Sequence, residues 1–364
     1  GLIGGRDALG FLGLITRQDH GQERDLLRAD FKNVGNETRL AHFYSIDGNR
    51  AVLAGGVRLY RGSTHRRQGF ANSGDGPSFR YLNPEQPGRS DFRFPSRNVA
   101  AYAENIFYLG DKFSLTPGVR YEFISTETEG SFVNRETDRA GNILVEENIS
   151  DNRTRNRDLI LFGLGATYQL KPDLELYANA SQNYRSVTFS NLRVVNRNLR
   201  VDNNIQDERG YNIDLGLRGQ LTDFLRMDAS LFYLGYNDRI GNVIKVDSAL
   251  FNTFRFRTNV ADSRTYGLES FAEFDLFRLL GAAPAGMQLS TFTNFTILRS
   301  RYHDADESAI DGREVEHVPS LMLKQGLTYR WRNLEAGLQY SFTGEQFTDA
   351  TNAESSPNAE TGII

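Results

Sequence analysis

The stretch YNIDLGLRGQLTDFLRMDASLFYLGY, from Tyr211 to Tyr236, decides the fold. On each side of a short break at Thr222-Asp223, apolar residues such as Leu215 alternate with polar ones such as Arg218. Successive side chains of a strand leave opposite faces, so this pattern predicts a β-hairpin with one apolar and one charged face. Two architectures contain such strands: a soluble two-layer sheet with one wet face, and a barrel whose apolar face meets lipid.

The same alternation recurs along the chain, and the number of repeats separates the two architectures. Strand-like segments cover 26–45, 50–60, 99–109, 113–124, 160–170, 174–184, 266–276, 287–297, 321–331 and 334–342. Most reach the ~10 residues that a tilted membrane-spanning strand needs. Short breaks join them in pairs, and long polar stretches, expected to be loops, separate the pairs, most notably 61–98 and 126–157. Short turns at one end and long loops at the other are typical of outer-membrane barrels rather than soluble sandwiches.

Composition agrees with a membrane barrel once the alternation is taken into account. Charged residues make up 24% of the 364 residues and the mean hydropathy is −0.49, which suggests a soluble protein. Alternating strands average out to polar, however, so the mean hides the apolar face. No run approaches the ~18 apolar residues of a spanning helix. The chain has no cysteine, which excludes disulfides and thiolate metal sites, and its net charge of −4 indicates no particular partner.

The two ends of the sequence favour an internal piece of a longer protein. Gly1 opens without a methionine, a basic n-region or an apolar h-region, so this segment contains no signal peptide. The last residues, NAESSPNAETGII, are a polar run followed by two isoleucines that resemble the start of another strand. We therefore expect 1–364 to be one fragment of a single β-barrel domain.

Four segments resemble the barrel of TonB-dependent outer-membrane receptors. They are TPGVRYEF (116–123), LELYANASQNYRS (174–186), DSRTYGLESFAEFDL (262–276) and VPSLMLKQGLTYRW (318–331). Two more, GVRLYRGSTHRRQG (56–69) and YSFTGEQFTDATNAE (340–354), are similar to the ferric dicitrate branch of that family. The resemblance extends from about Ala51 to the end, and the order and spacing of the motifs make it more specific than any one of them.

The resemblance implies a 22-stranded transmembrane antiparallel β-barrel, all-β in class, of which this chain would supply about 12–14 strands. It also implies an N-terminal plug that carries the TonB-interacting box, and a closing strand; the segment shows none of these. By analogy the protein is a multi-pass receptor of the bacterial outer membrane, in contact with lipid and lipopolysaccharide. It would not be an enzyme and would need no resident cofactor. Its cargo would be a ferric chelate, ferric citrate or another siderophore, and its energy would come from TonB with ExbB and ExbD through the plug. A passive porin or an adhesin barrel remains the alternative, and a plug upstream of Gly1 would separate them.

A cluster of arginines gives the candidate cargo site. Guanidinium groups bind carboxylates in a bidentate manner without losing their charge, which suits a ferric polycarboxylate. The candidates are Arg61, Arg66, Arg67, Gln68, Arg93, Arg97 and Arg185. Arg93 and Arg97 lie nearest the ligand-binding arginines of the resembling branch by motif order. The alternatives are solvated loop residues and partners of lipopolysaccharide phosphates.

Other motifs carry less. The basic stretch 191–204 lacks the aromatics of a nucleic-acid site, so we expect a solvated face or a lid. Asp304, Asp306, Glu307 and Asp311 form an acidic loop without the glycine and terminal glutamate of a calcium site. The five histidines have no paired ligand spacing, and no catalytic constellation appears. The four residues Asp214, Arg218, Arg226 and Asp228 are predicted to line the lumen and meet the plug.

Overall fold

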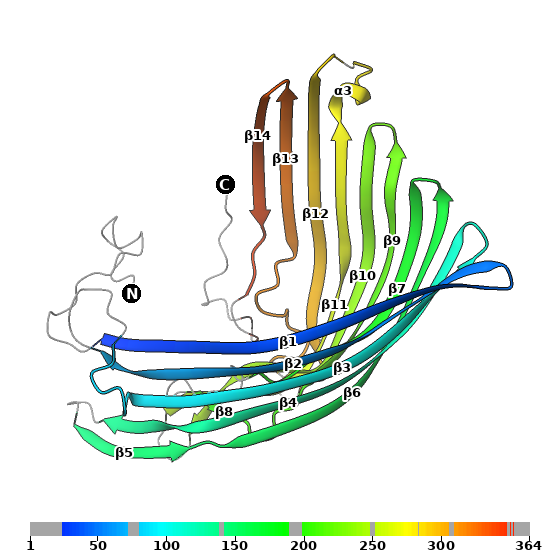
Figure 1. Cartoon of the computed structure of the whole chain (residues 1–364). Helices are drawn as coiled ribbons and strands as arrows, with labels where there is room; N and C mark the ends of the chain where they lie inside the picture. The colour runs from blue at the N-terminus through cyan, green and yellow to red at the C-terminus, as the bar shows by residue number, and fades with distance from the viewer. Residues whose placement is uncertain are drawn as a thin grey trace. The chain divides into compact units, whose positions relative to one another are not determined.

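The computed structural model describes residues 24–71, 80–137, 142–188, 199–247, 252–282, 284–305 and 309–347, together with 350 and 352. These residues form one antiparallel sheet with the strand order β1-β2-β3-β4-β6-β7-β9-β10-β11-β12-β13-β14 (Figure 1). Two short strands lie off this path: β5 pairs with β4, and β8 pairs in parallel with β11. The described part thus contains 14 strands, within the 12–14 that the resemblance implied, although β5 and β8 were not among the segments predicted as strands.

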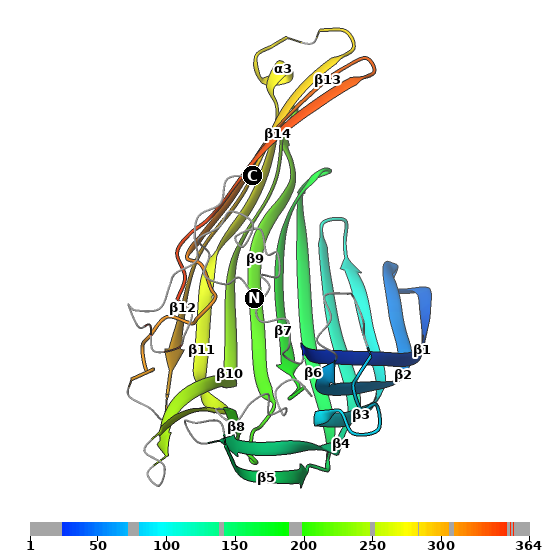
Figure 2. The same cartoon turned by 90° about the vertical axis from the view of Figure 1, so that its left-hand side faces the viewer.

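The strands are long, and tight turns join them in hairpins. Their bounds are β1 Arg24–Ile46, β2 Asn49–Ala71, β3 Gly88–Leu109, β4 Phe113–Thr137, β5 Ile143–Ser150, β6 Arg153–Lys171, β7 Leu174–Arg185, β8 Leu199–Val201, β9 Glu208–Thr222, β10 Leu225–Asp247, β11 Asn252–Asp275, β12 Met287–His303, β13 Leu321–Trp331 and β14 Leu334–Thr343. A one-turn helix, α3 Leu276–Leu279, begins the connection from β11 to β12, as Figure 2 shows. The short turns expected in five of the strand pairs are confirmed, at 47–48, 110–112, 172–173, 223–224 and 332–333; the connection from β11 to β12 is longer.

Contacts divide the chain into two compact units. The first comprises residues 1–36, 58–99 and 123–158, and the second comprises 37–57, 100–122 and 159–364. β1, β2, β3, β4 and β6 each contribute residues to both units. No helix in the described ranges has the length and apolar character needed to cross a lipid bilayer.

The decisive hairpin has the predicted apolar face. Leu215 pairs with Leu231, and Leu217 pairs with Ala229, so the apolar side chains of β9 and β10 share one face. On β11 and β12 the same row continues through Leu268 and Ile297. These large apolar side chains are exposed to solvent in the isolated chain; Leu231, for example, is 60% accessible. The apolar face of these strands is therefore exposed and does not form a core.

Small apolar clusters lie instead toward the ends of the strands that are far from the tight turns. One cluster in the second unit gathers Val243, Val260, Tyr302, Ile310 and Val315. In the first unit, a smaller one joins Leu26, Ala71 and Tyr81. In these clusters, side chains of the connecting segments pack against side chains at the strand ends.

Two predicted loops are wrong. Most of 61–98 is strand, since β2 runs to Ala71 and β3 begins at Gly88. Most of 126–157 is strand as well, because β4 continues to Thr137 and pairs with β5 in an extra hairpin. Both faces of these segments carry polar residues, so they lack the apolar alternation by which the other strands were found. The segment 26–45, predicted to be strand-like, is the single strand β1.

Candidate functional site

The predicted arginines lie mainly on β2 and β3, in the parts of these strands that belong to the first unit. Along β2 the exposed apolar Leu59 precedes Arg61 by two residues, so the two share a face. Arg66 and Gln68 leave the opposite, polar face. The structure therefore divides the predicted set between two faces and does not gather it into one cluster.

Arg66 and Gln68 stand on the polar face of β2. The Arg66 side chain is half-buried, and its Nε has no hydrogen-bond partner among the described residues. Burial lowers the pKa of Arg66 from its ordinary value, but an arginine keeps its charge at neutral pH. Gln68 Nε2 donates to Asp25 Oδ2 at 2.9 Å, and Arg89 Nε lies 3.3 Å from the other oxygen of that carboxylate. Arg66 is thus a half-desolvated cation with a free donor next to a fixed amide.

Arg67 and His65 project from the other face and have local partners, although the Arg67 Nε, like that of Arg66, has no hydrogen-bond partner among the described residues. The Arg67 guanidinium lies 5.4 Å from the centre of the Tyr81 ring, and the Tyr81 hydroxyl donates to the Arg67 carbonyl oxygen at 2.9 Å. Burial is the main cause that raises the pKa of Tyr81. His65 Nε2 lies 2.7 Å from Asp91 Oδ1. Arg67 and His65 therefore support the outer ends of β2 and β3.

Arg61 and Arg97 stand side by side on the apolar face. A Cβ atom on Gly62 would lie 3.1 Å from Ser96 Oγ, which places these two residues opposite each other. In an antiparallel pair, Arg61 and Arg97 are then the next opposed residues and share the other face. Both side chains are exposed, as is that of Arg93, two rungs further on the same face of β3. None of the three has an ion pair or hydrogen bond within the described ranges.

Arg185 is far along the chain, at the end of β7 in the second unit, and is already paired. Its Nη2 lies 2.7 Å from Glu208 Oε1, and the backbone N–H of Ile240 donates to the same oxygen at 2.7 Å. Glu208 is only 4% exposed, so its charge needs this partner. Burial, and then the nearby Arg185, lower the pKa of Arg257. Arg185 therefore neutralises a buried carboxylate.

A charged network on the polar face of the second unit escaped the sequence analysis. The Tyr102 hydroxyl donates to Glu37 Oε1 at 3.2 Å, and the Arg120 guanidinium lies 5.6 Å from the centre of the Tyr102 ring. Arg120 Nε in turn lies 2.7 Å from Glu122 Oε2. The sequence did show two acid–base pairs with a spacing of two residues, Glu37 with Arg39 and Arg120 with Glu122. Such a spacing puts both members of a pair on one face of a strand. Their meeting through Tyr102 was not predictable, because 65 residues separate Tyr102 from Glu37.

Three of the four predicted lumen residues of β9 and β10 have polar partners along this face, and the fourth, Arg226, lies on the same face. Arg218 Nε lies 2.5 Å from Glu175 Oε1, and the Tyr177 hydroxyl donates to Asp228 Oδ1 at 3.0 Å. Asn212 Nδ2 donates to Asp214 Oδ2 at 2.7 Å. The register places Arg226 opposite Gln220 on this face. Contact of these residues with a plug stays a prediction.

The remaining sequence motifs supply no site. Asp306 and Glu307 of the acidic loop lie outside the described residues, as do residues 191–198 of the second basic stretch. Among the residues that are described, no three histidine or acidic side chains gather closely enough to hold a metal ion. The pair Gly55-Gly56 in β2 is a close-approach position, because a Cβ on Gly56 would lie 2.6 Å from the Thr38 carbonyl oxygen.

Comparison with known proteins decides the family. The family model described as TonB dependent receptor-like, beta-barrel matches residues 5–361. The chain belongs to the TonB-dependent receptor β-barrel family. The predicted fold class, a transmembrane antiparallel β-barrel, is thereby confirmed, and the match begins well before Ala51, where the sequence resemblance began. Barrels of this family lie in the outer membrane and act as transport receptors, not as enzymes.

Individual relatives agree with this TonB-dependent receptor fold. The chain is 36% identical over 89 residues to the rhizobactin receptor of Rhizobium meliloti (strain 1021), covering 24% of this chain and 12% of that one. Among solved structures, the unliganded ferric citrate transporter FecA matches with a TM-score of 0.67 and 20% identity, over 94% of this chain and 47% of FecA. The closed form of the ferric-catecholate import receptor Fiu from E. coli matches with a TM-score of 0.67 and 14% identity, over 92% of this chain and 47% of Fiu. The chain thus spans about half the length of these two structures and a smaller part of the rhizobactin receptor.

Proposed function

We propose that this chain is part of the wall of an outer-membrane uptake receptor for a ferric chelate. The whole receptor would include a plug, and TonB with ExbB and ExbD would act on the plug to open a path through the barrel. Membership of the TonB-dependent receptor family supports energised uptake over a passive porin or an adhesin. The proposal of iron as the transported metal draws on the names of the rhizobactin receptor, FecA and Fiu.

The environment of Arg66 is the main observation that supports the proposed ligand site. It combines a fixed positive charge, partial burial and an Nε–H donor without a partner among the described residues. A buried donor of this kind favours an incoming acceptor, because leaving it unpaired costs about 1–3 kcal/mol. It lies on the polar face of β2, eighteen residues after the turn at Gly48, and so on the loop side of the sheet. We propose that Arg66, with Gln68 beside it, binds the anionic shell of the chelate.

The ligand that fits this site best is a polycarboxylate chelate such as ferric citrate. A carboxylate accepts two parallel hydrogen bonds from one guanidinium, whereas a neutral hydroxamate offers weaker acceptors and no net charge. Other ferric siderophores use the same fold, so the choice depends on affinity. Arg185 fits the role less well because Glu208 already neutralises it.

Calorimetric titration of the full-length receptor tests the ligand class. Ferric citrate should bind more tightly than a neutral hydroxamate chelate or a catecholate chelate. Arg66→Ala should weaken ferric citrate binding about tenfold or more, since a hydrogen bond to a charged group contributes about 1.5–3 kcal/mol. Arg97→Ala removes the same charge from the opposite face and should leave the affinity unchanged. Equal affinities for Arg66→Ala and the wild type would remove Arg66 from the site.

Whole-cell uptake tests the energised mechanism separately. Cells that carry the receptor should accumulate radiolabelled ferric citrate only when TonB and the proton gradient are present. Uptake that continues without TonB would contradict active transport, whatever the affinity measurements show.

A further inference from the structure

A second row of arginines lies on the same polar face of the first unit as Arg66, in a stretch that the sequence pattern assigned to a loop. The segment DNRTRNR, residues 151–157, contains one acid and three arginines. Because alternate residues of a strand leave the same face, Arg153, Arg155 and Arg157 form one row on β6. Their side chains are half-buried or buried, whereas the residues between them are exposed. The row therefore lies on the protected face of this strand.

The strand register brings this row level with Arg66 across β3 and β4. The pairing of β2 with β3 described above places Arg66 opposite Phe92. A Cβ on Gly130 would lie 2.8 Å from the Phe92 Cα, so Phe92 and Gly130 oppose each other in turn. On the far side of β4, the Asp151 N–H donates to the Gly130 carbonyl oxygen at 2.9 Å. Arg66 and Asp151 thus lie in one row of the sheet, and Arg153 lies in the next row toward the tight turns, on the same face.

An apolar strip separates Arg66 from the arginines of β6. Phe92 and Phe94 of β3 have stacked rings with centres 5.8 Å apart, and each side chain is only 5% exposed. Gly130 continues the strip on β4, where the Phe92 ring packs closely against it. Three strand spacings of ~4.8 Å put the backbones of Arg66 and Arg153 about 14 Å apart. Positive charge therefore stands on both sides of a neutral strip, at a separation that two long side chains and one small chelate can span.

Arg66 and Arg153 each have a donor without an acceptor. The Arg66 Nε and the Arg153 Nη1 are both buried and have no hydrogen-bond partner among the described residues. Arg153 Nε lies 2.5 Å from Asp151 Oδ1, which holds one edge of the guanidinium in place. Further along the row such a donor is used, since Arg157 Nη1 donates to Thr126 Oγ1 at 2.8 Å. An unpaired buried donor is unfavourable, so both positions favour an incoming anionic acceptor.

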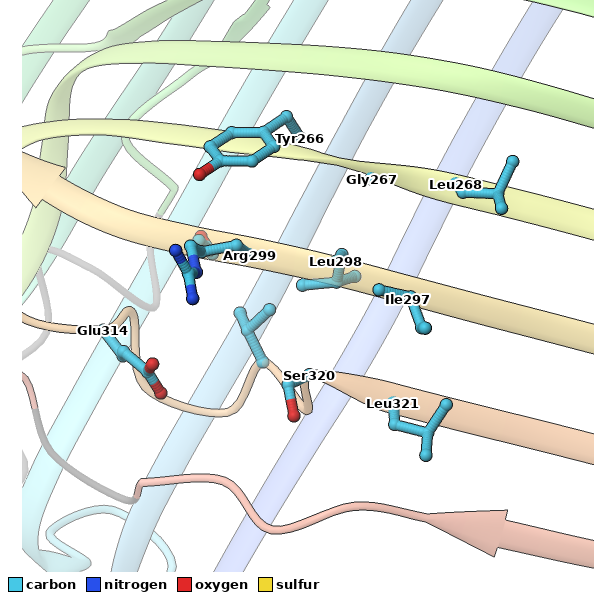
Figure 3. Close-up of a pocket in the computed structure, with 11 residues that line it drawn as sticks. Tyr266, Gly267, Leu268, Ile297, Leu298, Arg299, Glu314, Ser320 and Leu321 are labelled. Atoms are coloured by element: carbon cyan, nitrogen blue, oxygen red, sulfur yellow. The ribbon is translucent and has the colours of Figure 1, made fainter.

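The arginines beside the pocket of the second unit are different, because an acid accompanies them. This pocket, of about 620 Å³, lies on β11, β12 and the start of β13. Figure 3 shows Glu314 at the same end of the pocket as Arg299. Glu314 also forms an isolated β-bridge with Arg301. An anion gains less at this pocket, since a carboxylate already stands next to the arginines.

We propose that Arg153 is a second arginine of the cargo site, and that a single chelate bridges Arg66 and Arg153 through two separate carboxylates. This inference rests on the proposed function, because it concerns the same polar face and the same anionic cargo. It adds a requirement on the cargo, which must present anionic groups on two opposite sides. A chelate with one exposed carboxylate reaches only one of the two arginines.

Calorimetric titration of the full-length receptor with ferric citrate tests the bridge. The wild type should bind one chelate per receptor, and Arg153→Ala should weaken binding about tenfold or more, because it removes a charge-assisted contact. Arg153→Lys keeps the charge but not the fork of donors, so its affinity should lie between the two. The double variant Arg66→Ala/Arg153→Ala should bind about a hundredfold more weakly than the wild type. Arg97→Ala, on the opposite face, should bind as the wild type does.

A competition measurement on the wild-type receptor needs no variant to fold. Tricarballylate is an iron-free tricarboxylate, and acetate carries a single carboxylate. Two linked carboxylates that bind both arginines at once gain from their linkage. Tricarballylate should therefore displace ferric citrate at a concentration at least about tenfold lower than acetate.

Three outcomes would overturn the bridge. The first is equal affinity of Arg153→Ala and the wild type for ferric citrate. The second is a stoichiometry of two chelates per receptor that falls to one in Arg153→Ala, which would indicate two independent anion sites. The third is displacement by acetate and by tricarballylate at the same concentration. A wild-type receptor that does not bind ferric citrate at all would instead contradict the proposed ligand class, so the two failures are distinguishable.

Discussion

Tyr302 is a fully buried tyrosine at the outer end of β12, beyond the membrane-spanning part of the strand. Its ring belongs to the apolar cluster with Ile310 and Val315, and its hydroxyl donates to Glu316 Oε2 at 2.6 Å. Burial first, and then the negative charge of Glu316, raise the pKa of Tyr302. One side chain thus ties the segment between β12 and β13 to the sheet.

Replacing Tyr302 by phenylalanine should destabilise the full-length receptor by about 1.5–3 kcal/mol at neutral pH, the usual contribution of a hydrogen bond to a charged group. In the unfolded chain a tyrosine releases its proton near pH 10, whereas buried Tyr302 holds it to higher pH. The stabilisation is therefore complete below pH 10 and is lost as the pH rises above 10. Urea unfolding at pH 7 and at pH 11 should show a smaller difference between the two proteins at pH 11. A difference that is the same at both pH values would contradict the assigned role.

The arginine site shows what could be predicted at the level of single residues. Arg66 and Gln68 were found from the density of arginine in 58–97, and their polar-face position follows from the alternation in β2. The sequence could not show that Arg185 is paired with Glu208, because that contact joins the ends of two strands. The sequence analysis also grouped Arg61, Arg93 and Arg97 with Arg66. It treated 61–98 as a loop, and only in a strand do alternate residues point to opposite faces. The role of these three arginines in cargo binding stays a prediction that the observed faces do not favour.

At the scale of elements, the outer parts of β2 and β3 depend on close backbone approach. Gly69 has no side chain, and a Cβ atom there would lie 1.8 Å from the Pro87 carbonyl oxygen. The Phe70 N–H donates to the same carbonyl oxygen at 3.0 Å. Glycine at position 69 therefore allows the Pro87 backbone to approach β2 closely.

Gly69→Ala should loosen the outer part of β2 without unfolding the barrel. A clash with backbone cannot be relieved by rotating a side chain, and overpacking typically costs about 1–3 kcal/mol. Amides of 61–71 should then exchange with deuterium about tenfold faster or more, as followed by mass spectrometry.

Gly337→Ala in β14 is the matched control, because the nearest atom to its Cβ would be the Leu327 carbonyl oxygen at 3.8 Å. It should leave exchange in β13 and β14 unchanged. Equal protection of 61–71 in Gly69→Ala and the wild type would mean that β2 shifts to admit the methyl group.

Hairpins were predictable where one face is apolar. The turn at Arg332-Asn333 and the bounds of β13 agree with the sequence pattern to the residue. The extra hairpin of β4 with β5 was missed, because Arg135 pairs with Glu146 across it and polar residues occupy both faces. Strands that have water on both faces need no alternation of apolar and polar residues, so the sequence pattern does not reveal them. Strands with one face toward lipid do show this alternation.

For the whole molecule, the apolar face defines the part that meets lipid. Leu231 stands near the middle of that face, between paired leucines on β9 and β11. Asn294, on β12, projects from the polar face, since it pairs with Phe271 beside Glu269 and Glu273. The two positions test which face is the lipid side.

Leu231→Arg should lower the stability of the inserted receptor by about 2–4 kcal/mol, the cost of an arginine at the midplane of the lipid face. Asn294→Arg introduces the same side chain on the polar face and should change stability far less. Urea unfolding in lipid vesicles measures both. A larger loss for Asn294→Arg than for Leu231→Arg would reverse the assignment of the faces.

The continuous pairing of β2 to Ala71 and of β3 from Gly88 has a thermodynamic consequence for binding. Ordering a flexible residue costs roughly 1–2 kcal/mol of conformational entropy. Had 61–71 been a mobile loop, a ligand that contacted Arg66 would have had to supply that free energy. Here the hydrogen bonds between β2 and β3 already fix the backbone. The loss of conformational entropy therefore occurs on folding and not on ligand binding. Association at this position should therefore show the small heat-capacity change of rigid-body docking, without the large negative value that accompanies coupled folding.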